Sequence, residues 1–296
     1  MNLTTFGIGL ASGIGLGSIY ALIAVGFNLV VASTGYFMFA LESIVALGGI
    51  SYRILGGEHG WPLGVVLPVV CIGGAAVGAV LEVIVHRPFV GRTKNVGLPV
   101  LLASVGVAIA IDAFVAQLVG SDPKSAPDYI SPRPFMVGSV PVGRPYVVMF
   151  AVVVLIAIVL EVVFSSTTIG RRLRVLQADR EGAALLGHNV KITTTAVFAV
   201  AGLLAALAGL LVTPVTSSSP SVGSALVVPA FAALAIGGFG SFRGAIGGAL
   251  AVGLLSGLLP LYVAPAYLSP TLLLLIIVTL VIRPRGLFAL RAAREL

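Results

Sequence analysis

Residues Tyr146–Phe164 read YVVMFAVVVLIAIVLEVVF, a stretch in which only Glu161 carries a charge. A helix that crosses the hydrocarbon core of a membrane needs about 20 mostly apolar residues. The stretch has that length, and it lacks the alternation of apolar and polar residues that is typical of a barrel strand, so it predicts a membrane-spanning helix. Comparable stretches recur along the chain: Phe6–Ala32, Tyr36–Tyr52, Pro62–Val85, Val96–Val119, Thr193–Thr213 and Tyr267–Ile282.

The composition agrees with this interpretation. Hydrophobic residues make up 58% of the 296 residues and charged residues only 9%, and the mean hydropathy is +1.15. A soluble globular domain has about 25% charged residues. We therefore predict an all-α, polytopic transmembrane bundle of about eight to ten membrane segments, in a single domain over residues 1–296. The net charge of +7 is assigned to loops beside the membrane, and not to nucleic-acid binding.

The apolar region Leu226–Leu259 is interrupted by GGFGSFRG at residues 237–244. A helix over residues 226–238 would be about 20 Å long, which is short of a hydrocarbon core of about 30 Å. One interpretation is a broken helix that marks a substrate path, because irregular backbone at membrane depth lines cavities or is buried in protein. The other is a tight turn between two short crossings, with Arg243 in the cytoplasm. The sequence leaves both open.

Small residues recur at intervals of four in several apolar stretches, as in Gly9, Gly13, Gly17 and Ala21. In lipid, such residues let helix backbones approach closely and gain van der Waals contact. We expect most of these faces to pack tightly within the bundle. Sliding of some of them during transport is the alternative.

The basic residues predict the orientation of the chain, because cytoplasmic loops are enriched in Lys and Arg. They form three clusters near residues 87–94, 171–191 and 283–294. If all three clusters are cytoplasmic, the N-terminus lies outside and the loop 120–145 is external.

The longest polar segment, residues 165–195, reads SSTTIGRRLRVLQADREGAALLGHNVKITTT and holds five of the seventeen Lys and Arg residues. Asp179 is a favourable N-cap, Glu181 suits the positive start of a helix, and Gly187 fits the position after its end. These signals predict a short helix over Arg180–Leu186, which we expect to dock on another protein in the cytoplasm.

Four acidic residues lie inside apolar stretches. An acidic side chain at the bilayer centre costs roughly 2.5–3.5 kcal/mol, so a central acid usually faces a cavity or a partner. Glu82 and Glu161 lie near predicted cytoplasmic ends, and we expect them to reach water. Asp112 lies near the middle of its span and is the strongest candidate for a functional intramembrane acid, and Glu42 is a candidate for the same path. Neutralisation by protonation or by an arginine is the alternative for both.

Catalytic motifs are absent from the sequence. The three histidines lack metal-ligand spacing, and no GxxxxGK[ST] phosphate-binding loop occurs. We therefore expect no enzyme activity, no cofactor and no bound metal.

Several stretches resemble one known family. The sequence EGAALLG, from Glu181 to Gly187, is similar to the E-A-A-x-x-x-G coupling motif of ABC importer permeases, with Gly182 in place of the second alanine. Together with GSIYALIAVGFNLV, HRPFVGR, GGFGSFRGAIGGALAVGLL and RPRGLF, in that order, the chain resembles the branched-chain amino-acid ABC transporter permease family, LivH type. The resemblance extends over nearly the whole chain.

The resemblance implies a multi-pass permease of the bacterial inner membrane that imports branched-chain or related amino acids and contacts membrane lipid. Its implied partners are a homologous second permease or a second copy, two cytoplasmic ATPase subunits that hydrolyse ATP, and an extracytoplasmic solute-binding protein. Coupling to the ATPase is expected of the following residues: Asp179, Arg180, Glu181, Ala183, Ala184 and Gly187. Candidates for the translocation path are the following residues: Asn28, Met38, Glu42, Asp112, Gly238 and Gly240.

Two alternatives remain at this stage. The family often has N-F-A-H-G-E early in its second span, where this chain has MFALES at residues 38–43 and keeps only Phe and Ala. This difference leaves open an ABC permease for another small solute, such as urea, an amide or a sugar. Asp112 and the interrupted region motivate the other alternative, an ion-coupled secondary transporter.

Overall fold

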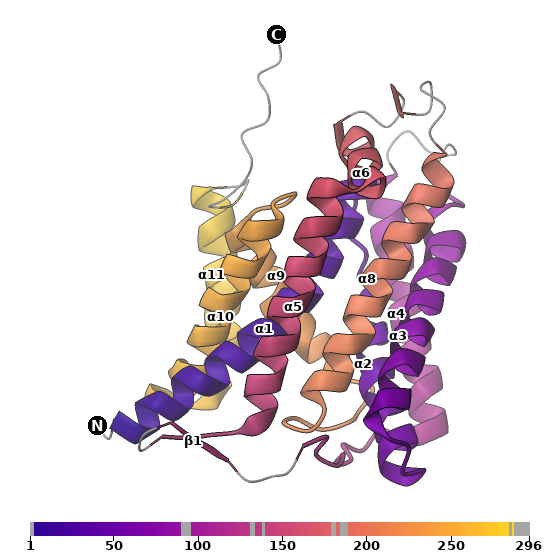
Figure 1. Ribbon diagram of the computed structural model, residues 1–296. Helices are drawn as coiled ribbons and strands as arrows, with labels where there is room; N and C mark the ends of the chain where they lie inside the picture. Colours follow the sequence, from indigo (N-terminus) through magenta and orange to yellow (C-terminus); the bar gives the residue numbers. More distant parts are fainter. Residues whose placement is uncertain are drawn as a thin grey trace.

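The computed structural model describes residues 3–89, 96–130, 134–137, 140–178, 182–183, 189–283 and 286. In these residues the chain is a bundle of helices with one small β-hairpin (Figure 1). The long helices are α1 (Leu3–Thr34), α2 (Leu41–Tyr52), α3 (Leu63–Leu81), α4 (Gly97–Val119), α5 (Arg144–Ser166), α8 (Val190–Val212), α9 (Val222–Gly237), α10 (Phe242–Tyr262) and α11 (Leu268–Ile282). Helix α6 (Thr168–Ala178) lies at one end.

The predicted bundle of membrane helices is confirmed. Seven helices of the described residues are long and apolar enough to cross a membrane, and α9 is a shorter apolar helix. Helix α2 is extended by a π-helix over Arg53–Glu58, and α3 is extended by a second one over Glu82–His86. The described residues thus contain seven full-length candidates for the predicted eight to ten segments, besides the shorter helices α2 and α9. Large apolar side chains are exposed on the outer helices, as expected where lipid or another subunit covers them, for example at Ile72, Leu98, Leu118 and Val281.

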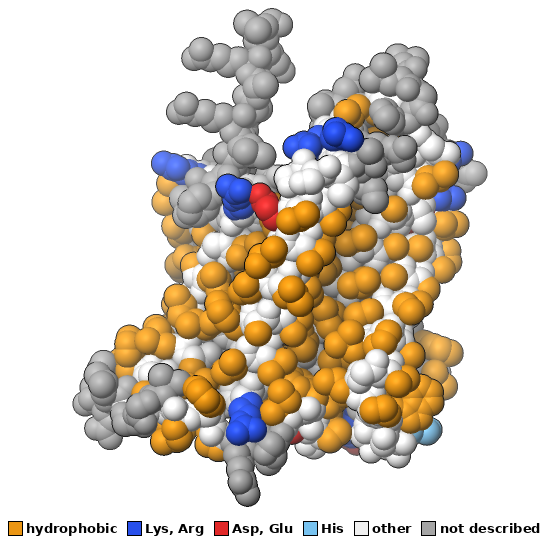
Figure 2. Space-filling view, in the orientation of Figure 1, with side chains coloured by type: hydrophobic (Ala, Val, Ile, Leu, Met, Phe, Trp, Pro, Cys, Tyr) orange, Lys and Arg blue, Asp and Glu red, His pale blue; other side chains and the backbone are white. Residues whose placement is uncertain are grey.

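Basic side chains gather at one end of the bundle, which we call the basic end, while hydrophobic side chains cover its middle (Figure 2). Helices α3, α5 and α11 end there, and α6 lies across it (Figure 1). The basic end carries Arg87, Arg171, Arg174, Arg243 and Arg283. Helix α1 starts at the other end, which we call the opposite end. The three predicted basic clusters therefore fall on one side wherever their residues are described, which agrees with the predicted orientation.

The first and last parts of the bundle have the same arrangement of helices in opposite directions (Figure 1). Helices α1, α2 and α3 run toward, away from and toward the basic end, whereas α8, α9 and α10 run away from, toward and away from it. The pairing of helices follows the same relation, because α1 packs on α10 and α3 packs on α8, while α1 and α8 pack on each other. Opposed structural repeats of this kind are common in transporters.

Glycines form the closest helix contacts in the bundle. A Cβ atom on Gly13 or Gly17 of α1 would meet the backbone of α10 around Gly253 at about 3 Å, and Gly74 of α3 lies against the backbone of Gly202 in α8. These faces leave no room for a side chain. Tight packing of the small-residue faces, which was predicted from their spacing, is confirmed at these positions.

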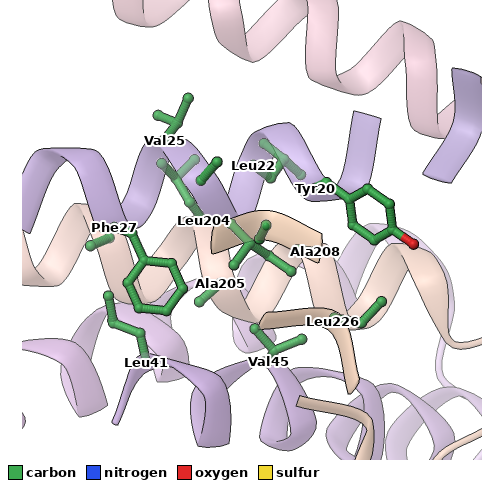
Figure 3. Packing of buried hydrophobic residues seen from close by; sticks show 14 of the residues in the cluster. Tyr20, Leu22, Val25, Phe27, Leu41, Val45, Leu204, Ala205, Ala208 and Leu226 are labelled. Atoms are coloured by element: carbon green, nitrogen blue, oxygen red, sulfur yellow. The ribbon is translucent and has the colours of Figure 1, made fainter. Parts of the chain in front are cut away.

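The core lies between α1, α2 and α8. In Figure 3, Phe27 of α1, Leu41 of α2 and Leu204 of α8 belong to one cluster of packed side chains. All three side chains are buried. Helices α1 and α8 are largely buried, whereas α3, α4, α5 and α11 are mostly exposed and form the outer surface.

At the opposite end the loop between α4 and α5 crosses the bundle. It contains β1 (Phe135–Val137), which pairs with β2 (Val140–Val142) in an antiparallel hairpin. The Tyr129 hydroxyl donates to the carbonyl oxygen of Leu211 at 3.2 Å, and Lys124 forms an antiparallel bridge with Ser218. The loop therefore ties the end of α8 and the segment before α9 to the α4–α5 connection. The hairpin was not predicted.

The interrupted region at residues 237–244 is a tight turn at the basic end. Helices α9 and α10 pack on each other in opposite directions, and Gly237 and Gly244 meet at their backbones. Of the two interpretations left open by the sequence, the turn between two crossings is confirmed, and Arg243 lies at the basic end. The polar segment 165–195 also differs from expectation, because α6 was not predicted there.

Candidate functional site

Two helices begin inside the bundle and meet at their starting points. Helix α2 begins at Leu41 after the non-helical segment 35–40, and α9 begins at Val222 after the segment 213–221. Gly223 lies directly against the backbone carbonyl of Glu42, with no space for a side chain between them. The N-terminal ends of two helices, each with unpaired N–H groups and a partial positive charge, are thus adjacent.

Two serines fix the start of α2 against the middle of α4. The Ser104 hydroxyl oxygen accepts a hydrogen bond from the backbone N–H of Phe39 at 3.1 Å, and the Ser43 hydroxyl donates to the carbonyl of Ala108 at 3.2 Å. Both serines are buried. Because residues 104–108 lie near the midpoint of α4, the start of α2 lies at mid-depth. The expectation that 36–52 is one continuous span is therefore wrong, since its first residues are not helical.

Glu42 and Asp112 lie near this point, on α2 and α4. Both are partly exposed, and Ser43, next to Glu42, donates to the carbonyl of Ala108, one turn before Asp112. Neither forms an ion pair with any residue that the structure describes. The structure thus brings together the two acids that the sequence singled out, and it adds Ser43, which the sequence analysis missed because a lone serine in an apolar stretch carries no signal.

Met38 has a different environment from these acids. It is 1% exposed and belongs to the core. Aromatic rings surround the segment 35–40, since Phe37 stacks on Phe27 at 4.8 Å between ring centroids and contacts the edge of Phe231 at 4.9 Å. Non-helical backbone at mid-depth is therefore held by aromatic packing from α1 and α9.

The remaining path candidates lie at the basic end. Gly238 and Gly240 both have positive φ, of 95° and 83°, which form the turn between α9 and α10. Asn28 of α1 is 4% exposed, and its side-chain oxygen accepts a hydrogen bond from the N–H of Gly240 at 2.7 Å. The six path candidates therefore fall into three groups. Glu42 and Asp112 lie at mid-depth, Met38 lies in the core, and the other three lie at the turn between α9 and α10.

The predicted coupling residues are described only in part. Ala183 is helical and 1% exposed, and Gly182 before it is also helical. Asp179, Arg180, Glu181, Ala184 and Gly187 lie outside the described residues, and so does most of the predicted helix Arg180–Leu186.

Glu82 does not reach water, so that expectation is wrong. It is 1% exposed and accepts hydrogen bonds from the Arg87 guanidinium at 2.8 Å and from the Thr195 hydroxyl at 3.0 Å. Arg87 also donates to Thr195 at 2.7 Å. This cluster joins the end of α3 to the first turns of α8. Glu161, in contrast, is 43% exposed and pairs with Arg243 at 2.7 Å. Its exposure agrees with the expectation that it reaches water.

These features define the class of protein. A bundle of membrane-length helices, built from opposed repeats around two helices that begin at mid-depth, is an integral membrane transport protein. The chain belongs to the permease family of branched-chain amino-acid transport systems, because the profile described as "Branched-chain amino acid transport system / permease component" matches residues 9–281. The predicted family is thus confirmed.

Individual relatives cover almost the whole chain. The high-affinity branched-chain amino acid transport system permease protein LivH of Escherichia coli K12 is 28% identical over 292 residues, which cover 93% of each chain. The corresponding protein BraD of Pseudomonas aeruginosa is 27% identical, with 94% of each chain covered. The ribose import permease protein RbsC of Haemophilus influenzae is 30% identical over 84% of this chain and 76% of its own length. No solved structure matches.

Proposed function

We propose that the chain is the pore-forming permease subunit of an ATP-driven importer of branched-chain or related amino acids, and that solute passes the adjoining starts of α2 and α9. The single observation that carries the path is the contact between Gly223 and Glu42 at mid-depth. Helix N-termini inside a membrane attract the carboxylate of a zwitterionic solute, and the nearby carboxylates of Glu42 and Asp112 suit its ammonium group.

The names of the relatives support the solute class, and the family supports the partners. We propose two cytoplasmic ATPase subunits that dock at the basic end, on the segment that includes Ala183. A second permease and an extracytoplasmic solute-binding protein complete the transporter, in the bacterial inner membrane. The exposed apolar faces of α4 and α5 offer area for the second permease or for lipid.

A sugar is the second candidate solute, and the 30% identity to the ribose permease favours it. A sugar has no carboxylate or ammonium group. Neutralising Glu42 and Asp112 together, as Glu42→Gln with Asp112→Asn, should therefore abolish uptake of an amino acid and leave uptake of a neutral sugar largely intact.

The path can be tested by labelling a single cysteine. Cys71 is the only cysteine of the chain, so Cys71→Ala provides the background. Ser224, in the first turn of α9, is exposed in the single chain. In the transporter assembled with its partners, Ser224→Cys should react with a small water-soluble thiol reagent, and leucine together with the binding protein and ATP should change the rate.

Ser125→Cys, in the loop at the opposite end, is the matched control and should react at the same rate in every state. A Ser224→Cys variant that transports leucine but never reacts would contradict the path. Uptake of leucine that continues without ATP would contradict the ATP-driven mechanism.

A further inference from the structure

A cavity of about 380 Å³ opens at the basic end between α1, α5, α6 and the turn that precedes α10. It lies where α5 and α10 both pack on α1, and the Glu161–Arg243 ion pair joins α5 to α10 in its lining. Most of its wall is apolar and includes Leu29, Phe164, Leu173 and Phe242.

A separate and much smaller apolar crevice, of about 10 Å³, lies nearer the middle of the bundle. Its walls include Val25 of α1, Val153 and Ala157 of α5, and Ile246 of α10. Phe242 borders both spaces. In Figure 3 the Val25 side chain points away from Leu41 and Val45, on the side of α1 that does not face α2. The side of the cavity that faces the middle of the bundle is therefore bordered by apolar side chains.

The mouth of the cavity is basic. Arg174 of α6 and Arg243 of α10 both line it and are exposed, and Arg171 lies one turn from Arg174 on α6. Glu161 pairs with Arg243 and is the one acid in the lining. The positive N-terminal end of α10, which Ser241 caps, faces the same space.

A buried donor also faces the cavity. Asn28 is 4% exposed and lines the space, and its side-chain oxygen is fixed by the N–H of Gly240. This bond determines the orientation of the amide, so its NH₂ group lies on the other side. The Asn28 side chain is thus a fixed polar group in the lining, beside Arg243 and Gly240.

Helix α6 has the pattern of a helix that lies in a membrane interface. Leu173 and Leu176 are buried, whereas Arg171 and Arg174 are exposed. Such a helix places its basic face at the level of the lipid headgroups. The mouth of the cavity is therefore at the depth of the phosphates.

We propose that this cavity binds an anionic phospholipid of the leaflet at the basic end. Its phosphate is held by Arg174 and Arg243, and the first part of its acyl chain lies in the cavity against Leu29, Phe164 and Phe242. Basic pockets between membrane helices are suited to anionic headgroups. A small anion without an acyl chain would make no contact with the apolar wall of the cavity. The inference goes beyond the proposed transport function and does not depend on the solute.

The test uses the full chain in nanodiscs made of equal parts phosphatidylglycerol and phosphatidylcholine. Native mass spectrometry of the released protein should show retained phosphatidylglycerol in preference to phosphatidylcholine. Arg174→Gln and Arg243→Gln should each weaken retention by about fivefold. Lys191→Gln removes an exposed charge from the same end but away from the cavity, and should leave retention unchanged.

A second variant separates lipid binding from general effects of charge. Ala32 lines the cavity, so Ala32→Phe fills it without changing a charge and should also reduce retention. Equal retention of phosphatidylglycerol by the wild type and by a variant with both Arg174→Gln and Arg243→Gln would overturn the proposal. Displacement of the lipid by inorganic phosphate would assign the site to a free anion, and loss of all lipid when the ATPase subunits bind would assign the cavity to that protein interface. Either result would also overturn it.

Discussion

The side-chain oxygen of Asn28 accepts a hydrogen bond from the backbone N–H of Gly240 at 2.7 Å, across 212 positions of sequence. The bond joins the last third of the first helix to the turn between α9 and α10. Gly240 has positive φ, so its N–H points away from both helices and has no helical partner. A single buried amide therefore holds the two opposed parts of the bundle together at the basic end.

Removal of this bond should destabilise the protein. Asn28→Ala removes the hydrogen bond to the Gly240 N–H and leaves a void where a side chain that is 4% exposed stood, at a cost of about 1–3 kcal/mol. Thermal unfolding of the purified chain in detergent measures the loss. Ser241→Ala is the matched control, because it removes the N-cap of α10 in the same turn and costs only about 1 kcal/mol. A smaller shift for Asn28→Ala than for Ser241→Ala would contradict this role.

Two glycines of the same helix should respond in opposite ways to alanine. A Cβ on Gly253 would overlap the backbone of Gly17, so Gly253→Ala should cost about 1–3 kcal/mol through overpacking. A Cβ on Gly247 meets nothing within 4 Å, so Gly247→Ala should stabilise α10 by up to about 1 kcal/mol. Melting temperatures of the two variants check the prediction. Shifts of the same sign would show that α1 and α10 are not in close contact.

The two ion pairs at the basic end should differ in their contribution to stability. Glu82→Ala removes a carboxylate that is 1% exposed and leaves the Arg87 guanidinium without it, which should cost about 3 kcal/mol. Glu161→Ala breaks a pair that is largely in water, and should cost less than about 1 kcal/mol. A double-mutant cycle with Arg87→Ala isolates the buried interaction. The coupling energy between Glu82 and Arg87 should be larger than the coupling energy between Glu161 and Arg243.

The loop at the opposite end should loosen in alkali. Burial raises the pKa of Tyr129 above its usual value of 10, and Tyr52 and Asp128 add to the effect. The folded chain holds this proton more tightly than the unfolded chain, so the stability it contributes is complete below pH 10 and is lost as the pH rises above 10.

Tyr129→Phe should therefore reduce stability by about 1 kcal/mol at neutral pH and make its decline above pH 10 less steep. The measurement is chemical unfolding as a function of pH. The exposed Tyr267 supplies the control, and Tyr267→Phe should leave the slope unchanged. An identical slope in wild type and Tyr129→Phe would rule out Tyr129 as its source.

The membrane segments could be predicted because each depends on local composition. The boundaries of Val96–Val119 and Tyr267–Ile282 lie within one residue of α4 and α11, since lipid requires a minimum apolar length that is readable in the sequence. The glycine faces were predictable for a similar reason, because spacing of four places small residues on one side of a helix.

The depth at which a helix begins was not predictable. Residues 36–52 are mostly apolar, and contacts with Ser104, Phe27 and Phe231 hold the first of them in a non-helical conformation. The burial of Glu82 depends on Arg87 and on Thr195, which lies 113 positions away. Such pairings form only in the folded chain. The grouping of Glu42 with Asp112 was expected from their places inside apolar stretches, but the hydrogen bond from Ser43 to Ala108 that joins their helices was not.

The opposed directions of α1–α3 and α8–α10 give the chain two comparable hinges. The segment 35–40 enters from the basic end and stops at mid-depth, and the segment 213–221 enters from the opposite end and stops at the same place. The starts of α2 and α9 therefore meet at one mid-depth contact, between Glu42 and Gly223, that is reached from each end of the bundle through one short non-helical segment. A change in either segment would alter this contact from one side of the membrane only.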